Sequence, residues 1–205
     1  MNRLINVLAR IYPLKLIELF KLVNRYVLSA KIKYKFYKCG NNFKIHSPIY
    51  LRGEKNIVIG DDFWADPFLF LQCWDTYKCF KYNPQIMIGN HVHLGFGCHV
   101  GCINEIIIGD NLLTGRNVHI TDHNHGHINL NEVDVAPIER ELISKGKVII
   151  GNNVWIGDNV VILPGAKIGD GCIIGANSVV SSDIPDMCVA AGVPAKPIRH
   201  LNPNN

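Results

Sequence analysis

Four histidines lie close together in the middle of the chain and could carry acid–base chemistry: His119, His123, His125 and His127. The unperturbed pKa of a histidine is about 6.5, so near neutral pH its ring keeps a nitrogen that can accept a proton. That property suits a general base that deprotonates an attacking hydroxyl group. Most histidines in polar loops are solvated surface residues, so the surrounding fold must single out the one that reacts.

Metal binding is a second chemistry that these residue types suggest. Cys98 and Cys102 flank His99 closely enough to resemble part of a zinc site. We expect no structural zinc, because these residues do not complete a four-ligand set. The seven cysteines are an odd number without Cys-x-x-Cys spacing, and several fall at apolar positions of a repeat, so we expect buried free thiols in a reducing compartment.

A six-residue repeat defines the elements that must position the histidines. Aliphatic residues recur at every sixth position, and glycine often follows them: Ile150, Ile156, Ile162, Ile168, Ile174 and Val180. The same repeat occurs at Ile88-Gly89, Leu94-Gly95, Val100-Gly101 and Ile108-Gly109. A period of six fits neither a helix nor a long strand, so each unit is predicted to be a short strand followed by a turn. Gly, Asn and Asp permit such turns, and three units make one coil of a parallel β-helix.

The repeat is interrupted between residues 121 and 147. This segment is polar and contains three histidines, so we expect it to protrude from the coils as a loop. Long loops in compact domains are usually functional or disordered, and the histidines favour function. We therefore predict a β-helix domain over residues 41–200, with this loop, and a tail at 201–205.

Residues 1–40 form a basic head on a mildly acidic body. They contain nine lysines and arginines and one acid, Glu18, a balance of +8 within a chain of net charge +4, so the remainder sums to −4. Residues 1–37 are predicted to be helical, with Pro13 beginning a second helix. Its apolar stripe either packs on the first coil or another subunit, or rests on an anionic membrane. Charges interrupt the apolar residues, so we expect neither a secretory signal nor a membrane span.

Aromatic residues are concentrated in residues 61–82. We expect them mainly to fill the core of an irregular first coil, with an acceptor groove as the alternative. The basic head carries no groove-reading helix motif or aromatic RNA-binding signature, so we predict no nucleic-acid partner.

Three further motifs follow the histidine loop: GNNVWIG at 151–157, PGAKIGDGCIIGANSVV at 164–180 and AAGVPAKPIR at 190–199. With the repeats, they make residues 86–200 resemble the hexapeptide-repeat acyltransferases, within the branch of galactoside, maltose and polysaccharide O-acetyltransferases. The resemblance implies a left-handed β-helix and a homotrimer with each site between two subunits. It also implies direct transfer of an acetyl group from acetyl-CoA to a sugar or glycan hydroxyl, without a covalent enzyme intermediate or a metal.

The resemblance also implies roles for residues around the loop. His123 of ITDHNHG matches the general base, and His125 becomes a contact for the acceptor. Asp122 is left as another acceptor contact, because neighbours in an extended segment point to opposite faces and we do not expect it to orient the ring. Trp155 matches a tryptophan near the reacting centre and the bound substrates.

Other matched positions would bind coenzyme A. Asp158 stands where related enzymes use a small residue whose backbone N–H faces the thioester, which puts a side-chain role in doubt. Cationic side chains near the C-terminus suit the nucleotide phosphates. The remaining residues assigned to the donor are Gly175, Ala176, Ser181, Lys196 and Arg199.

Three other functions compete with this interpretation. A γ-type carbonic anhydrase would need three histidines around zinc, for which His93, His119 and His123 are candidates. An N-acetyltransferase acting on an amino sugar and a non-catalytic β-helix scaffold are the other two. We expect a cytoplasmic enzyme, peripheral on the inner face of the plasma membrane if its helix binds lipid, acting on a surface polysaccharide or its lipid-linked precursor.

Overall fold

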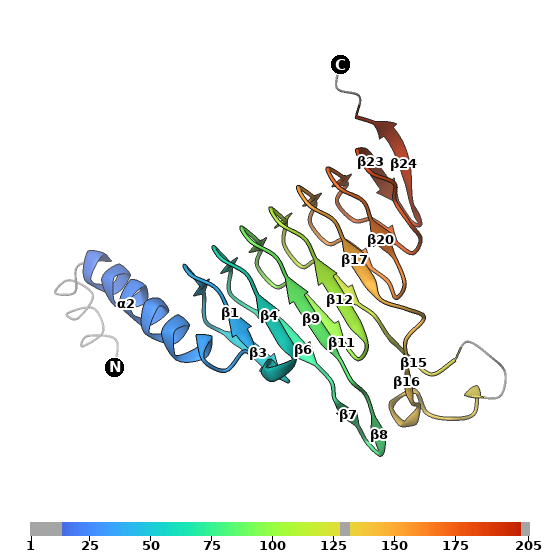
Figure 1. Cartoon of the computed structure of the whole chain (residues 1–205), viewed down its shortest axis with the longest axis horizontal. Coiled ribbons are helices and arrows are strands. Elements are labelled where there is room, and N and C mark those ends of the chain that lie inside the picture. The colour runs from blue at the N-terminus through green and yellow to red at the C-terminus, as the bar shows by residue number, and fades with distance from the viewer. Residues whose placement is uncertain (1–13, 128–131, 202–205) are drawn as a thin grey trace, which may run out of the picture.

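The computed structural model describes residues 14–127 and 132–201, which form one helix followed by a triangular prism of short strands (Figure 1). Each coil of the chain lays one strand on each of three faces, and strands of successive coils pair in parallel. The predicted parallel β-helix is therefore confirmed.

Three sheets make up the faces of the prism. The first face contains β1 (Lys38–Cys39), β4 (Ile57–Ile59), β9 (Gln85–Ile88), β12 (Glu105–Ile108), β17 (Val148–Ile150) and β20 (Lys167–Ile168). The second face contains β2 (Lys44–Ile45), β5 (Trp64–Ala65), β10 (His93–Leu94), β13 (Leu113–Thr114), β18 (Trp155–Ile156), β21 (Ile173–Ile174), β23 (Cys188–Gly192) and β24 (Ala195–His200). The third face contains β3 (Ile49–Arg52), β6 (Leu69–Cys73), β11 (His99–Cys102), β14 (His119–Thr121), β19 (Val161–Ile162) and β22 (Val179–Val180).

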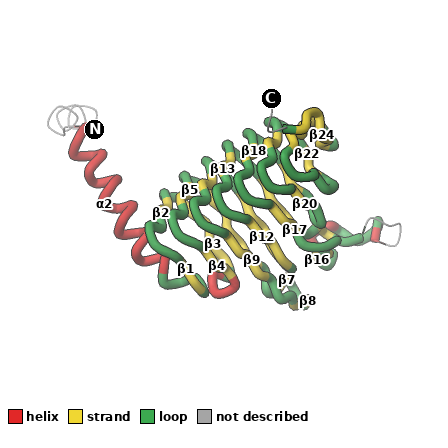
Figure 2. The backbone as a smooth tube through the Cα atoms, turned by 45° about the horizontal axis from the view of Figure 1, so that its top comes forward, coloured by secondary structure: helices red, strands yellow, loops and turns green. Residues whose placement is uncertain are grey.

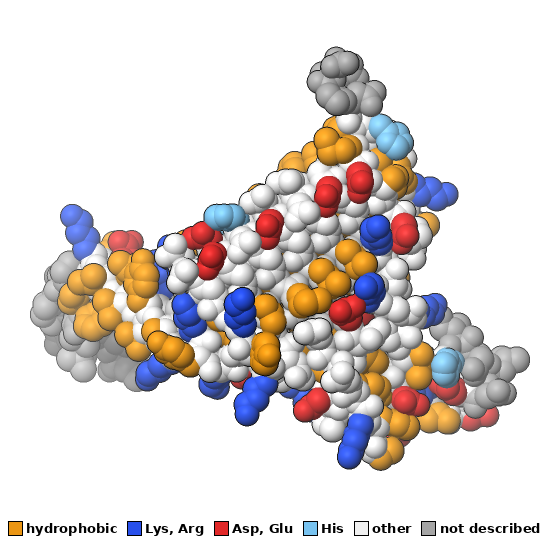
Figure 3. All heavy atoms as spheres, viewed as in Figure 1, with side chains coloured by type: hydrophobic (Ala, Val, Ile, Leu, Met, Phe, Trp, Pro, Cys, Tyr) orange, Lys and Arg blue, Asp and Glu red, His pale blue; other side chains and the backbone are white. Residues whose placement is uncertain are grey.

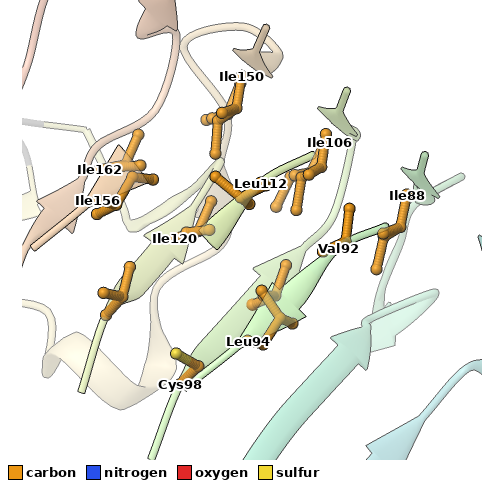
Figure 4. Close-up of a cluster of buried hydrophobic side chains, with 14 of the residues drawn as sticks. Ile88, Val92, Leu94, Cys98, Ile106, Leu112, Ile120, Ile150, Ile156 and Ile162 are labelled. Atoms are coloured by element: carbon orange, nitrogen blue, oxygen red, sulfur yellow. The ribbon is translucent and has the colours of Figure 1, made fainter. Parts of the chain in front are cut away.

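Aliphatic side chains from all three faces fill the core of the prism (Figure 4). On the first face Ile88 pairs with Ile108, which pairs in turn with Ile150, and none of the three is more than 3% exposed. Burying one such side chain contributes about 1.5–3 kcal/mol relative to leaving it exposed. The aliphatic residues of the six-residue repeat thus stack from coil to coil and form a continuous column on each face.

Glycine and asparagine have different roles at the corners of the prism, although both were predicted to permit the turns there. The left-handed conformation is adopted by asparagines such as Asn111 and Asn153, with φ of 59° and 56°. Their side-chain amides join in a ladder between coils, with a hydrogen bond of 2.9 Å. Gly109 is required by space instead, because a Cβ there would lie 2.7 Å from the side-chain oxygen of Asn152 in the next coil.

Helix α2 (Leu14–Lys33) projects from the N-terminal end of the prism (Figure 1). Its last turns are attached to β2: Ser29 and Ile32 are buried, and the Ser29 hydroxyl accepts the N–H of Ile45 at 3.0 Å. The prediction of helix to residue 37 was wrong, because the chain turns after Lys33 to bury Phe36 in the core. The predicted helical residues 1–13 lie outside the described part. Within the described part, no helix is long and apolar enough to cross a membrane.

Aromatic rings close the N-terminal end of the core, since Phe43 lies 5.6 Å from both Phe36 and Phe63 between ring centroids. At the other end, β23 and β24 form an antiparallel hairpin. Two more hairpins leave the prism between the third and first faces: β7 (Thr76–Tyr77) with β8 (Phe80–Lys81), and β15 (Asn124–His125) with β16 (Leu142–Ile143). All seven cysteines carry free thiols, and five of them are buried.

Candidate active site

The histidine loop leaves the prism where the third face ends. Strand β14 ends at Thr121, and the next strand of the prism, β17, begins at Val148. Between them lie β15, β16 and a short 3-10 helix, Pro137–Glu139. The first residues of this segment, Asp122 and His123, therefore stand at the corner, held on one side by the rigid coils.

Asp122 is buried and holds His123 by its ring. Its Oδ1 lies 3.0 Å from His123 Nδ1 and accepts the N–H of Ile103 at 2.9 Å. Its Oδ2 accepts the N–H of Asn104 at 2.8 Å and the thiol of Cys102 at 3.2 Å. Each carboxylate oxygen is therefore occupied by donors from the protein.

This geometry corrects both expectations for Asp122. The side chain is 0% exposed, so it cannot contact an acceptor. The alternation of side chains along a strand ends with β14 at Thr121, and the bend that follows turns the side chains of Asp122 and His123 toward one another. Asp122 is therefore the residue that positions His123.

The electrostatics of the pair fix the tautomer of His123. Burial raises the pKa of Asp122, but the hydrogen bonds from His123, Ile103 and Asn104 together lower that pKa below its usual value. An ionised carboxylate next to Nδ1 requires the ring proton there, which leaves Nε2 with a free lone pair. His123 is thus prepared to accept a proton at Nε2.

A pocket of about 600 Å³ lies in front of His123, between the third face and the two hairpins. His125, which was predicted to contact the acceptor, lines it, together with Trp74 and Tyr77. The pocket size falls within the range usual for small-molecule sites. The expectation that the aromatic residues of 61–82 mainly fill the core is correct for buried Phe63 and wrong for the others, which are half-buried or exposed; two of them line the pocket.

Two further histidines form the floor of the pocket. His99 and His119 are register partners on β11 and β14, with ring centroids 4.6 Å apart. Gly101 lies between the imidazoles of His99 and His123, since a Cβ there would be at ordinary contact distance from both, 3.4 Å from His99 Nε2 and 3.5 Å from His123 Cε1. Burial, with the neighbouring His119 and His123, lowers the pKa of His99 to about 4, and burial with His123 lowers that of His119. Both rings are neutral near pH 7.

His99 was not among the residues predicted for this site. The signal was available, because His99 precedes His119 by 20 residues, the same separation as between the paired residues Ile88 and Ile108. A residue one coil earlier at the same offset must lie on the same face.

The histidines expected for a γ-type zinc site are not brought together. His93 belongs to β10 on the second face and faces Asp66, with Nε2 3.5 Å from the carboxylate, whereas His119 and His123 belong to the third-face pocket. Among residues 14–127 and 132–201, no three His, Cys, Asp or Glu side chains are arranged to hold a metal ion.

Trp155 also lies apart from His123 within one chain. It belongs to β18 on the second face, between Leu113 and Ile173 in register, and is 52% exposed. It is not among the residues that line the histidine pocket. Its predicted role at the reacting centre therefore needs a surface from outside this chain.

The residues predicted for the donor lie mainly at the corner between the second and third faces. The carboxylate of Asp158 accepts the N–H of Arg116 at 2.7 Å, so its side chain serves the turn. Gly175 and Ala176 occupy the same corner one coil further on, between β21 and β22. Ser181 is exposed beyond β22, and exposed Lys196 and Arg199 lie on β24. His123 and the corner with Asp158 thus stand at opposite edges of the third face.

Comparison with known proteins shows the family to which the chain is similar. The family model "Bacterial transferase hexapeptide (six repeats)" matches residues 147–182. WbbJ of Escherichia coli (strain K12), provisionally assigned as a lipopolysaccharide biosynthesis O-acetyl transferase, is 36% identical over 162 residues, covering 77% of this chain and 79% of WbbJ. A solved galactoside acetyltransferase in complex with coenzyme A has a TM-score of 0.57 and 34% identity, covering 85% of this chain and 70% of that one.

A third similarity concerns the fold alone. The N-acyltransferase AntD from Bacillus cereus has a TM-score of 0.67 at 21% identity, covering 85% of this chain and 89% of AntD. The chain belongs to the hexapeptide-repeat acyltransferases, with their left-handed parallel β-helix. It is an acetyl-CoA-dependent acetyltransferase of that family.

Proposed function

We propose that this enzyme transfers an acetyl group from acetyl-CoA to a sugar hydroxyl of a surface polysaccharide or its lipid-linked precursor. The observation that carries the proposal is the buried, ionised Asp122 that holds His123 with Nε2 free at a pocket of sugar size. The relatives named for O-acetyl transfer to galactosides and in lipopolysaccharide biosynthesis support the choice of acceptor.

The reaction follows from the state of His123. Its Nε2 takes the proton of the acceptor hydroxyl as that oxygen attacks the thioester carbonyl carbon. Asp122 stabilises the imidazolium that forms, because the carboxylate is already placed at Nδ1. Acetyl-CoA supplies the acetyl group: as the new C–O bond forms, the C–S bond of the thioester breaks, and coenzyme A leaves as the thiolate, to which His123 can return the proton.

We further propose a homotrimer in which one copy supplies His123 and its neighbour supplies the donor groove. The small residues Gly175 and Ala176 suit the close approach of a pantetheine chain, and exposed Lys196 and Arg199 suit phosphates. Because the donor corner lies across the third face from His123, a second copy is the simplest source of a complete site. Trp155 would then complete the site from the neighbour's surface.

The basic helix supports a place at the inner face of the plasma membrane in the cytoplasm. Six apolar residues fall on one stripe of α2 and are 37–63% exposed: Leu16, Leu19, Phe20, Val23, Tyr26 and Val27 (Figure 3). The stripe lies opposite Ser29 and Ile32, which attach the helix to the prism. Lysines border it on both edges, Lys15 and Lys33 on one and Lys31 on the other, a pattern suited to anionic lipid.

Release of CoA thiol from acetyl-CoA tests the central proposal. The assay compares native protein with His123→Ala on a panel of sugars and lipid-linked glycans. We expect acceptor-dependent release that falls by about 10²–10⁴-fold in the variant, because that is the usual contribution of a general base. Retained acetyl-CoA binding in the variant is the control. Equal activity of the two proteins would reject His123 as the base, and absence of transfer by native protein to every acceptor would reject the sugar O-acetyltransferase.

A further inference from the structure

A hairpin that interrupts the third face forms the outer wall of the histidine pocket. Strands β7 and β8 leave the prism one coil before β11, on the same side as the histidine loop (Figures 1 and 2). The Tyr77 hydroxyl donates to the carbonyl of Ile138 in that loop at 2.8 Å. The Tyr82 hydroxyl accepts the N–H of Leu142 at 3.0 Å. The hairpin and the loop therefore hold each other in place, with the pocket between them and the third face.

The indole of Trp74 is held rigidly at the base of this hairpin. Its backbone N–H donates to the carbonyl of Cys102 at 2.8 Å, which continues the pairing of β6 with β11. The Arg52 guanidinium lies 3.8 Å from the centroid of the indole, and the ring of Tyr77 meets it edge-on at 6.2 Å. Trp74 and Tyr77 both line the pocket. The wall is thus a preformed aromatic surface.

The floor of the pocket adds two polar rings to the aromatic wall, those of His99 and His119. His99 and His119 are half-buried, and their rings meet edge-on at 4.6 Å between centroids. Both rings line the pocket and are neutral near pH 7, so each presents one donor and one acceptor nitrogen. A sugar hydroxyl, which both donates and accepts, matches such a group.

We propose that Trp74, Tyr77, His99 and His119 form an acceptor subsite that selects a pyranose ring. The ring lays its C–H face on the aromatic wall and bonds its hydroxyls to the two imidazoles, with the reacting hydroxyl at His123. The inference rests on the proposed function, which it deepens by naming the shape of the acceptor and the residues that select it.

An amphiphilic pocket of this kind distinguishes a pyranose from other hydroxyl compounds. An aliphatic alcohol leaves the imidazole nitrogens without partners, and an acyclic polyol has no flat C–H face for the aromatic wall. The aromatic wall and the imidazoles of His99 and His119 recognise the acceptor, whereas His123 carries out the chemistry. Removing His99 or Trp74 therefore weakens the binding of the acceptor and leaves acetyl-CoA binding unchanged.

Saturation-transfer NMR tests the subsite without any turnover. Methyl pyranosides of galactose, glucose, mannose and rhamnose are titrated into the full-length protein in the absence of acetyl-CoA. We expect at least one to bind, and Trp74→Ala and His99→Leu each to raise its Kd by about tenfold, which lies within the usual contribution of one aromatic contact or one hydrogen bond. His99→Gln restores binding, because its amide again donates and accepts.

Matched controls lie on the second face. Trp64→Ala removes another indole that a guanidinium covers, and His93→Leu removes another half-buried imidazole, both outside the pocket. These variants bind the pyranoside as native protein does. Thermal melts confirm folding, and His119→Leu replaces Trp74→Ala in the test if the latter does not fold.

The outcomes separate the two proposals. If native protein binds none of the four pyranosides, or if the pocket variants bind as tightly as native protein, the subsite is overturned. Pyranoside binding that depends on Trp74 and His99 without acetyl transfer keeps the subsite and rejects the transferase proposal. Acetyl transfer to pyranosides that is indifferent to both residues keeps the transferase and rejects the subsite.

Discussion

Asp122 shows how one residue can serve both the fold and the chemistry. Its carboxylate accepts from two backbone amides of the preceding coil and from the ring of His123. The motif order predicts His123 as the base, which stays a prediction, because the place of His123 before GNNVWIG can be read from the sequence. The role of Asp122 could not be predicted, because strand alternation fails at the bend where β14 ends.

Replacing Asp122 by Asn tests the dyad. Asn keeps the shape but loses the charge that holds the proton on Nδ1, so we expect kcat to fall by up to about 10²–10⁴-fold with the KM for acetyl-CoA unchanged. The two donors to the former Oδ2, the Asn104 N–H and the Cys102 thiol, lose their acceptor, so we also expect at least about 1–3 kcal/mol of destabilisation in urea unfolding. Asp110→Asn is the control, because that carboxylate also accepts a backbone N–H but lies between the first and second faces. A normal kcat in Asp122→Asn would remove Asp122 from the mechanism.

The neutral floor of the pocket predicts a dependence of stability on acid. The pKa of His99 is lowered in the folded state to about 4, whereas an unfolded histidine has a pKa of about 6.5. Between these values the unfolded chain binds more protons, so the stabilisation by the neutral ring falls as pH decreases through this window. We expect the urea midpoint of native protein to drop from pH 7 to pH 4.5 by more than that of His99→Leu. Parallel curves for the two proteins would contradict the pKa assignment.

Among the elements, the β-helix could be predicted and the hairpins could not. The series Ile150, Ile156, Ile162 and Ile168, which runs around one coil from face to face, predicts the strands because burial repeats every sixth residue. The β7–β8 hairpin has no repeat, and its position depends on contacts such as Tyr77 with Ile138, 61 residues apart. Residues that act across long separations leave no local period, so the aromatic wall of the pocket became visible only in the fold.

Helix α2 carries the prediction of lipid binding. We expect native protein to sediment with vesicles of phosphatidylcholine and phosphatidylserine, and less so as salt rises, because exposed charges are screened. Phe20→Glu places a charge in the middle of the apolar stripe and should abolish sedimentation. Tyr37→Glu, which alters an exposed aromatic residue outside the helix, is the control. Unchanged sedimentation of Phe20→Glu would assign the stripe to another partner, such as a second copy.

At the scale of the whole molecule, the two halves of the candidate site lie on different edges of one prism. His123 stands where the third face meets the first, and Ala176 stands where the third face meets the second. Stacked coils cannot bend to bring these edges together, because their core is continuous. The proposed site would therefore combine surfaces from two copies, and the proposed closed threefold symmetry would let every copy use both of its edges.

Complementation between inactive variants tests this geometry. His123→Ala removes the base, and Ala176→Trp fills the donor groove, so each variant alone should be inactive. In trimers co-assembled from equal amounts of the two variants, a site is intact when Ala176→Trp supplies the His123 edge and His123→Ala supplies the groove. Each condition is met half of the time, so we expect about a quarter of native activity. Light scattering should give three times the 23.0 kDa chain mass for native and mixed proteins alike. If the mixture stays inactive although the trimers form, both edges act within one chain, and the proposal of a site shared between two copies is rejected.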